Sequence, residues 1–435
     1  MKLKTKYFLL LICSLFFLKA EAKVTLTSIW GDNMVLQQQS EVTFYGKASP
    51  GKRVYVSASW NNRKISTVSN QDGRWELVLP TPEAGGPYTI TFSDGEELML
   101  KNILIGEVWF CSGQSNMEMP VKGFRGQPVF GSQPYIVSAH PKRPLRLYTV
   151  KNAWSTTPKE NGIEGKWSES SPEEVAGFSA TAYFFGHQLQ QSLDIPVGLI
   201  HCSWSMSKIE AWMNKEALSE FPGVTLPDAS QKEFGWAAGT PTLLWNAMVN
   251  PWKGFPVKGV IWYQGEFNSG GSGKEYATLF PCLINDWRQK WGIGDFPFIY
   301  VQLPNFGPVD QKPSEEGQGW RWVREGQLKA LALPNTAMAV TIDVGDPFDL
   351  HPIDKYDVGH RLALAARKLA YGEKITASGP LYQSMTIEGD KAIIHFSNCG
   401  SGLTIASSPY TPKGEKPKNS EKLTGFCIAG EDRKF

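Results

Sequence analysis

The sequence predicts an α/β fold in which helices cover a parallel β-sheet, with a small antiparallel β domain before it and a β-rich segment after it. From residue 102, short apolar runs alternate with amphipathic stretches, as in parallel sheets that have helices on both faces. Residues 24–100 instead show short alternating runs separated by turn pairs such as Pro50-Gly51 and Asp72-Gly73, a pattern that favours a β-sandwich. Residues 375–435 return to β-type patterning.

Each element of the α/β part follows from its apolar spacing. Strands are predicted at residues 103–111, 195–202, 257–263, 296–303 and 336–342. Helices are predicted at residues 178–193, 242–252, 276–291, 320–331 and 355–371. Ligands of such sheets bind beyond the carboxyl ends of the strands, so the residues directly after each strand are the candidates for function.

The chain divides into four parts. Residues 1–22 read as a signal peptide, because Lys2, Lys4 and Lys6 precede a short apolar run and Ala20-Glu-Ala22 offers a cleavage site. We therefore expect a secreted or periplasmic protein without a membrane anchor. The β-sandwich takes residues 23–101, the α/β domain residues 102–374, and a β-rich segment residues 375–435. That last segment ends without a returning strand, so we expect a truncated chain.

Composition restricts the possible partners. The formal net charge is +2, so no electrostatic footprint for nucleic acid is present. Five cysteines remain after the signal peptide, an odd and scattered set that does not form a disulfide framework. The 16 tryptophans are compatible with sugar stacking or with a large apolar core.

The first predicted strand runs into Gly113-Gln-Ser-Asn-Met117, with Ser112 just before it. A serine presented in a tight turn can act as a nucleophile if a base lies near it and N–H groups can stabilise an oxyanion. An ordinary strand-ending turn would use the same small residues. The motif alone leaves both interpretations open.

Two later strand ends carry the other polar candidates. Residues Trp262-Tyr-Gln-Gly-Glu-Phe-Asn268 place three polar side chains around one glycine, where they either face the crevice or cap the turn. The last strand of the sheet leads into Asp343-Val-Gly-Asp-Pro-Phe-Asp-Leu-His351. A loop histidine preceded by acids is what a general base with an orienting carboxylate requires.

These motifs together resemble the SGNH hydrolases and, within them, the sialate O-acetylesterase family of exported carbohydrate esterases. The likeness rests on residues 113–117, 262–268 and 351–363, and the early residues Asp32-Asn-Met-Val-Leu-Gln37 also look like that family's start. It implies an SGNH-type, flavodoxin-like three-layer hydrolase domain. It also implies hydrolysis of O-acetyl esters of sugars, foremost 9-O-acetylated sialic acids, with water as acyl acceptor and with neither metal nor cofactor.

The resemblance assigns roles to residues. Ser115 becomes the nucleophile and His351 the base, and Asp349 is our choice for the orienting acid, before Asp346 and Asp343. Oxyanion donors would be the N–H of Ser115, a backbone N–H near Ser205-Met206 and the side-chain amide of Gln264, with Asn268 in reserve. Glu266 belongs to the same crevice and is expected to have a partner there.

Two departures from the family pattern stand out. Many members have Gly-Gly where this chain has Ser205-Met206, so a backbone geometry that needs a positive φ is at stake. The common SGNH spacing puts an aspartate three residues before the histidine, and this chain has Phe348 there.

Three alternatives remain at this stage. The substrate could be acetylated xylan or another polysaccharide. A glycosidase would use paired carboxylates such as Glu107 and Glu266. A non-catalytic carbohydrate-binding protein would bind sugar without releasing acetate.

Overall fold

The computed structural model describes residues 23–161, 164–271, 273–307, 319–403 and 426–432, and Lys434. The predicted signal peptide, residues 1–22, lies outside the described residues. No described helix is both long and apolar enough to cross a membrane.

The N-terminal part consists of two groups of β-strands that pack face to face. One sheet has the order β1-β3-β6, and in the other β4 pairs with β5 and β7, β7 with β8, and β2 with β8. Buried and exposed residues alternate along β6, and rings from the two groups meet where Phe44 lies 5.4 Å from Phe92. These strands are β1 (Thr25–Leu26), β2 (Val35–Gln37), β3 (Glu41–Lys47), β4 (Arg53–Ala58), β5 (Lys64–Val68), β6 (Arg74–Pro80) and β7 (Gly85–Ser93).

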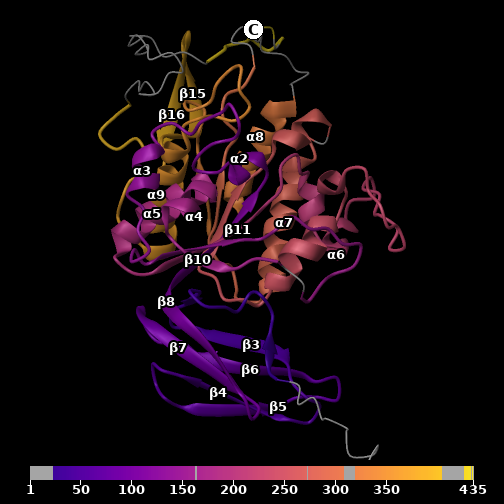
Figure 1. The fold of residues 1–435 in the computed structure, drawn as a ribbon. Helices are drawn as coiled ribbons and strands as arrows, with labels where there is room; N and C mark the ends of the chain where they lie inside the picture. Colours follow the sequence, from indigo (N-terminus) through magenta and orange to yellow (C-terminus); the bar gives the residue numbers. More distant parts are fainter. Residues whose placement is uncertain are drawn as a thin grey trace, which may run out of the picture.

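A single strand, β8 (Glu97–Gly113), connects this part to the large sheet. Its first half pairs antiparallel with β7, and its second half lies between β11 and β12, parallel to both. Figure 1 shows β8 rising out of the N-terminal strands toward the larger half of the molecule. The domain boundary predicted between residues 101 and 102 therefore falls inside one continuous strand.

The large sheet has the order β10-β9-β11-β8-β12-β13-β14. All neighbours from β9 to β14 run parallel, and β10 is antiparallel to β9. Counting from β8, its five main strands follow the 2-1-3-4-5 order of flavodoxin-like sheets, whose ligand site lies where the order reverses. The strands are β9 (Leu145–Thr149), β10 (Trp167–Glu169), β11 (Val197–Ser203), β12 (Gly259–Tyr263), β13 (Phe298–Val301) and β14 (Thr336–Ala339).

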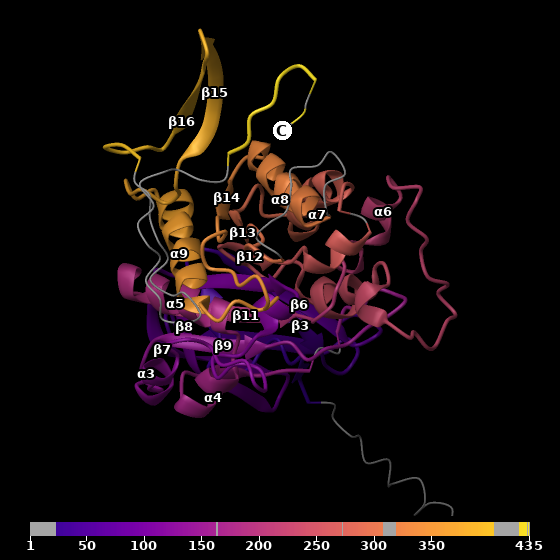
Figure 2. The same ribbon diagram turned by 90° about the horizontal axis from the view of Figure 1, so that it is seen from above.

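Helices lie on both faces of this sheet. Figure 2 shows α5 and α9 on one side of it and α7 and α8 on the other. The long helices are α5 (Ala180–Leu193), α7 (Tyr276–Trp291), α8 (Gly319–Lys329) and α9 (Lys355–Tyr371), close to their predicted ranges. The helix predicted at residues 242–252 is instead a π-helical turn, η3 (Trp245–Val249), followed by a 3-10 turn, η4 (Asn250–Trp252).

Shorter helical pieces fill the connections. They are α2 (Ser115–Glu118), α3 (Gln133–Val137), α4 (Pro172–Gly177), α6 (Lys215–Leu218), η1 (Ile209–Trp212), η2 (Ala237–Gly239), η5 (Glu266–Gly270) and η6 (Ala330–Ala332). Three of them, α2, η1 and η5, follow β8, β11 and β12 at the carboxyl end of the sheet. The loops that can carry a site are therefore held in short helical turns.

The core lies between the sheet and its helices. Every residue of β11 and β12 is buried. Six tryptophans are less than 2% exposed, namely Trp109, Trp212, Trp245, Trp252, Trp262 and Trp287. Much of the aromatic content thus stabilises the hydrophobic core rather than forming a surface for sugars.

The β-rich C-terminal segment contains a hairpin of β15 (Leu381–Glu388) and β16 (Lys391–Ser397). Figure 1 shows this hairpin projecting on the same side of the molecule as the carboxyl ends of the parallel strands.

Candidate active site

Ser115 is the first residue of α2, directly beyond the carboxyl end of β8. The turn that presents it requires a glycine at position 113, where φ is +147° and a Cβ would lie 2.0 Å from the carbonyl oxygen of Tyr263. Ser112, in contrast, lies inside the strand, fully buried, and its hydroxyl has no partner among the described residues. Of the two serines, only Ser115 is positioned to meet a ligand.

The surroundings of Ser115 leave its polar groups available. Neither its hydroxyl nor its backbone N–H has a hydrogen-bond partner among the residues that the structure describes. N–H groups in the first turn of a helix have no intrahelical acceptor, so they can donate to a ligand. A hydroxyl and a free N–H on one residue are what a nucleophile with its own oxyanion donor needs.

His351 lies in the loop between β14 and α9 and is half-buried. Its Nε2 is buried and lacks a partner within the described part of the chain, while the ring of Phe124 packs edge-on 5.3 Å away. Burial lowers the pKa of His351 below its ordinary value of 6.5, the charge of Lys355 lowers it further, and Asp349 opposes both. The imidazole is therefore kept neutral, the form that accepts a proton.

Asn116 ties the serine turn to the histidine loop. Its Nδ2 donates to Glu266 Oε1 at 2.6 Å and to the carbonyl oxygen of Leu350 at 3.1 Å. Its Oδ1 accepts a 2.5 Å hydrogen bond from the Nζ of Lys355. Because Asn116 follows Ser115 and Leu350 precedes His351, these bonds hold the two candidate catalytic residues next to each other.

The two ionisable partners of Asn116, the acid Glu266 and the base Lys355, are both buried. Glu266 is 5% exposed and Lys355 is fully buried. Burial raises the pKa of Glu266, and the Asn116 bond and the charge of Lys355 oppose that rise. Burial lowers the pKa of Lys355 to about 7, against the charges of Glu266, Asp349 and Asp354. Glu266 was expected to have a partner, and that partner is the side-chain amide of Asn116. Lys355 binds the oxygen of the same amide.

The three acids proposed to orient His351 occupy different positions. Asp349 accepts two hydrogen bonds from Gln127 Nε2 and one from the backbone N–H of His351 at 2.8 Å. Asp346 accepts from the backbone of Phe348 at 2.8 Å. Asp343 pairs with Arg361 through both oxygens at 2.6 and 2.7 Å. Asp349 alone touches His351, and it does so through the backbone rather than through the ring.

A fourth acid, which the sequence reasoning missed, lies just after the histidine. Asp354 caps α9 by accepting from the backbone N–H of Asp357, and its other oxygen is buried without a partner among the described residues. Burial is the largest cause that raises the pKa of Asp354 to about 6. The common SGNH spacing puts the aspartate three residues before the histidine, whereas Asp354 comes three residues after His351. The family pattern therefore did not point to Asp354.

The segment after β11 takes the backbone conformation that the sequence put in question. Met206 has φ +58°, in the left-handed region, so the geometry usually given to glycine is present with a methionine. The N–H and hydroxyl of Ser205 both donate to Glu118 Oε2, each at 2.5 Å. The N–H of Met206 has no acceptor among the described residues and is the free donor here.

The two amides after β12 hold the loops together and do not face the crevice as free donors. Gln264 Nε2 donates to the carbonyl oxygen of Ser207 at 3.0 Å and to Asn268 Oδ1 at 2.7 Å. Asn268 Nδ2 donates to Glu210 at 2.9 Å. Both side chains are fully buried.

Gln114, which the sequence reasoning did not single out, has a free amide. Its Oε1 accepts from the backbone of Gly265 and Phe267 at 3.4 and 3.3 Å, whereas its Nε2 has no partner among the described residues. Its position next to Ser115 was the signal available in the sequence.

Glu107 and Glu266 do not form a pair of catalytic carboxylates. Glu107 pairs in register with the first residue of β11, at the amino end of the parallel strands. It lies six residues before Gly113, so about 20 Å of strand separate it from the serine turn. Glycosidase carboxylates lie within about 10 Å of each other. The carboxylate of Glu107 is instead bound by Gln38 at 2.5 Å and Tyr371 at 3.0 Å.

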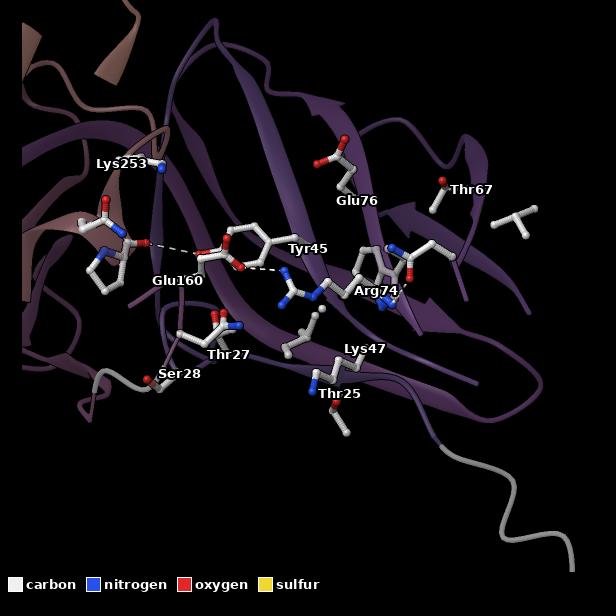
Figure 3. A pocket seen from close by; sticks show the side chains of 18 residues that line it. Thr25, Thr27, Ser28, Tyr45, Lys47, Thr67, Arg74, Glu76, Glu160 and Lys253 are labelled. Carbon is white, nitrogen blue, oxygen red and sulfur yellow. Dashed lines mark hydrogen bonds and ion pairs between the residues drawn. The ribbon is translucent and has the colours of Figure 1, made fainter. Parts of the chain in front are cut away.

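A pocket of about 990 Å³ opens at the junction between the N-terminal strands and the α/β part (Figure 3). Tyr45 donates to the carbonyl oxygen of Pro251 at 3.3 Å, and Arg74 pairs with Glu160 at 2.6 Å beside it. None of the candidate site residues lines this pocket. It belongs to the contact between the two parts of the chain.

Comparison with known proteins identifies the family of this chain. Residues 105–368 match the family described as carbohydrate esterase, sialic acid-specific acetylesterase. The human sialate O-acetylesterase is 32% identical over 84% of this chain and 75% of its own length, and the mouse protein 30% identical over 84% and 77%. The crystal structure of a carbohydrate acetylesterase from Xanthomonas citri superimposes with a TM-score of 0.78 at 37% identity, covering 86% of this chain and 81% of that one. This chain is an ester hydrolase that belongs to the sialic acid-specific acetylesterase family of carbohydrate esterases.

Proposed function

We propose that this protein removes O-acetyl groups from sugars, foremost 9-O-acetylated sialic acids, with Ser115 as nucleophile and His351 as base in an SGNH-type domain. The observation that carries the proposal is the Asn116 bridge, which holds the turn of Ser115 against the loop of His351. The family match and the relatives named as sialate O-acetylesterases support the substrate class.

The chemistry follows from the groups that are left free. The hydroxyl oxygen of Ser115 attacks the acetyl carbonyl carbon and gives its proton to Nε2 of His351, which has no other partner within the described part of the chain. The same proton then passes to the sugar oxygen as the ester bond breaks and acetyl-Ser115 forms. Water, activated by His351, attacks this acyl-enzyme and releases acetate. Catalytic hydrogen bonds are often longer in an unliganded site, so the unpaired serine and histidine fit this sequence of steps.

Three groups are proposed to stabilise the oxyanion. They are the free N–H groups of Ser115 and Met206 and, in place of the engaged amide of Gln264, the free Nε2 of Gln114. Removal of one oxyanion donor costs about a hundred- to a thousandfold in turnover. Gln114→Ala should therefore lower kcat by that factor, with Gln264→Ala acting through stability.

We propose Asp349 as the acid that positions His351. Its oxygen accepts from the histidine backbone and its carboxylate is fixed by Gln127, so it holds the conformation of the loop. Asp354 is the second candidate, because it has a buried oxygen without a partner among the described residues. Asp349→Asn should lower kcat with little change in the stability of α9, whereas Asp354→Ala should weaken the cap of that helix.

Acetylated polysaccharide is the alternative substrate. The structural relative from Xanthomonas citri is named only as a carbohydrate acetylesterase, without a particular sugar. Acetate release from 9-O-acetylated sialic acid should exceed that from acetylated xylan under matched acetyl concentration. The reverse ranking would replace the sialic acid by the polysaccharide and leave the chemistry in place.

The N-terminal strands, residues 23–101, are proposed to brace the esterase unit, residues 102–374, rather than to line its crevice. The contacts of Tyr45 and Arg74 lie at the junction pocket, which includes none of the candidate site residues (Figure 3). Tyr45→Phe and Arg74→Ala should lower the melting temperature and leave the KM for sugar esters unchanged. A raised KM for sugar esters, with an unchanged KM for an aryl acetate, would contradict bracing.

Export by a cleaved signal peptide at residues 1–22 is also part of the proposal. When the full chain is expressed in a bacterium, the mature protein outside the cytoplasm should begin at Lys23. Uncleaved protein in the cytoplasm would contradict it.

The experiment that tests the mechanism is trapping of the acyl-enzyme. The protein is mixed with excess aryl acetate, and the reaction is quenched in acid within milliseconds. The protein is then digested, and the masses of its peptides are measured by mass spectrometry. An acetyl group on the peptide that contains Ser115, absent in Ser115→Ala, is expected. Turnover without an acetylated peptide under burst conditions would refute a serine nucleophile.

A further inference from the structure

Exposed apolar side chains stand in the loops that follow the strands of the sheet. Met206 follows β11, Phe267 follows β12, Phe306 follows β13 and Phe348 follows β14, and their exposed fractions lie between 38% and 95%. Single exposed apolar side chains are common, whereas a group of them in mutual contact beside a catalytic site indicates a surface for a ligand.

Phe267 belongs to a group of side chains that also contains a second aromatic ring and a lysine. The ring of Trp236 lies 4.7 Å from that of Phe267, and the two are 36% and 38% exposed. The Nζ of Lys208 stands 5.6 Å from the centre of the Trp236 ring. An accessible pair of rings and an ammonium group therefore lie side by side.

This arrangement is fixed to the serine turn. The backbone N–H of Phe267 donates to Gln114, the neighbour of Ser115. The backbone N–H of Lys208 donates to the carbonyl oxygen of Ala238 at 3.1 Å, and the Trp236 ring packs so closely on Gly239 that a Cβ there would meet it at 2.3 Å. The rings and the cation are thus held in place, with Phe267 joined to the serine turn, before any substrate arrives.

Lys208 has no ion-pair partner in the part of the chain that the structure describes. No carboxylate there lies within ion-pair distance of its Nζ, which stands over the Trp236 ring. The two acids on neighbouring segments are engaged elsewhere, since Glu118 accepts from Ser205 and Glu210 accepts from Asn268. An ammonium group beside an ester-hydrolysing site is left for an anionic group of the ligand.

We propose that Lys208, Trp236 and Phe267 form a subsite for the acidic sugar whose acetyl ester Ser115 attacks. Lys208 binds the sugar carboxylate, and the two rings pack against the apolar face of the sugar ring or its side chain. This inference rests on the proposed function and adds to it the residues that select an anionic sugar over a neutral one.

The test compares substrates that differ in one charge. Acetate release is measured with 9-O-acetylated sialic acid and with its methyl ester, which lacks the carboxylate charge, in the parent protein, Lys208→Met and Trp236→Ala. Lys64→Met is the matched control, because Lys64 also stands over an aromatic ring, 4.3 Å from that of Tyr55, and lies in the N-terminal strands. Melting temperatures establish that each variant is folded.

In the parent protein, kcat/KM should be higher for the acid than for its methyl ester. Lys208→Met should lower this ratio by about ten- to a hundredfold, the value of a hydrogen bond to a charged group. Trp236→Ala should raise KM for both substrates about two- to tenfold, as expected for lost ring packing. Lys64→Met should keep the parental ratio.

The possible failures are distinguishable. If the parent hydrolyses both substrates and Lys208→Met keeps the parental ratio, the subsite is refuted and the proposed function stands. If Lys64→Met lowers the ratio as much as Lys208→Met, the effect is one of overall charge and the subsite is also refuted. If the parent releases no acetate from either sugar, the proposed function fails and this inference fails with it.

Discussion

Substitution of Asn116 by alanine removes the bridge between the serine turn and the histidine loop. The side chain is fully buried and makes hydrogen bonds to Glu266, to the carbonyl of Leu350 and to Lys355. Its loss leaves the carboxylate of Glu266 without a side-chain donor among the described residues, since its other oxygen is already unpaired. It also removes the acceptor of the Lys355 ammonium group.

The size of the effect follows from these contacts. Breaking the pairing of a buried charge costs about 3–5 kcal/mol. At about 2–4 °C for each kcal/mol, the melting temperature should fall by about 10 °C. Because the loop of His351 loses its anchor at Leu350, a shift of about 1 Å is enough to reduce kcat about a hundredfold.

The assay is thermal unfolding together with kcat on an aryl acetate. Asn246→Ala is the control, because Asn246 is also buried but its side chain makes one hydrogen bond within the described residues, at 3.0 Å to the carbonyl oxygen of Ser155. That variant should lose about 1–3 kcal/mol and keep its kcat. If Asn116→Ala were no less stable than Asn246→Ala and kept its kcat, the bridge would have no role in holding the site.

Three further predictions concern charge and backbone. Lys355→Met should move the acidic limb of the kcat/KM profile to higher pH. Lys355, whose pKa is about 7, is charged on that limb and lowers the pKa of His351, so its removal lets the pKa of His351 rise. An unmoved limb would contradict this coupling. Because the φ of Met206 is +58°, Met206→Gly should stabilise the protein by about 1 kcal/mol in thermal unfolding and keep its activity. Met206→Ile should destabilise the protein. Equal stability of the two variants would argue against a strained position. Glu107→Gln should lower the melting temperature and leave kcat for the ester unchanged, because this carboxylate binds Gln38 and Tyr371 far from the serine turn. A loss of kcat at full stability would contradict this structural role.

The fold was largely predictable because its signals are local. The five strands predicted from apolar runs are all present, and four of the five predicted helices lie within a few residues of their expected ranges. Strands β9 and β10 were missed, since they are short and lie within a long polar connection. The continuity of β8 across two sheets was also not visible, because periodicity shows that a strand exists but not which partners it pairs with.

The site was predictable in its positions and less so in its contacts. Motifs placed Ser115 and Met206 just after strands and His351 in the loop after the last strand, and the structure has them there. The directions of polar side chains depend on packing between distant segments, so the engagement of Gln264 could not be read from its neighbours. The buried position of Lys355 was hidden for the same reason, since a lysine in the first turn of a helix is usually exposed.

The central claim is that Ser115 and His351 carry the reaction. The most direct measurement is acetate release from an aryl acetate by the parent protein, Ser115→Ala and His351→Ala, with melting temperatures to establish that all three are folded. Turnover in the parent should fall by about 10⁴-fold or more in each variant, as for other paired nucleophiles and bases. A folded Ser115→Ala protein with parental turnover would contradict the account.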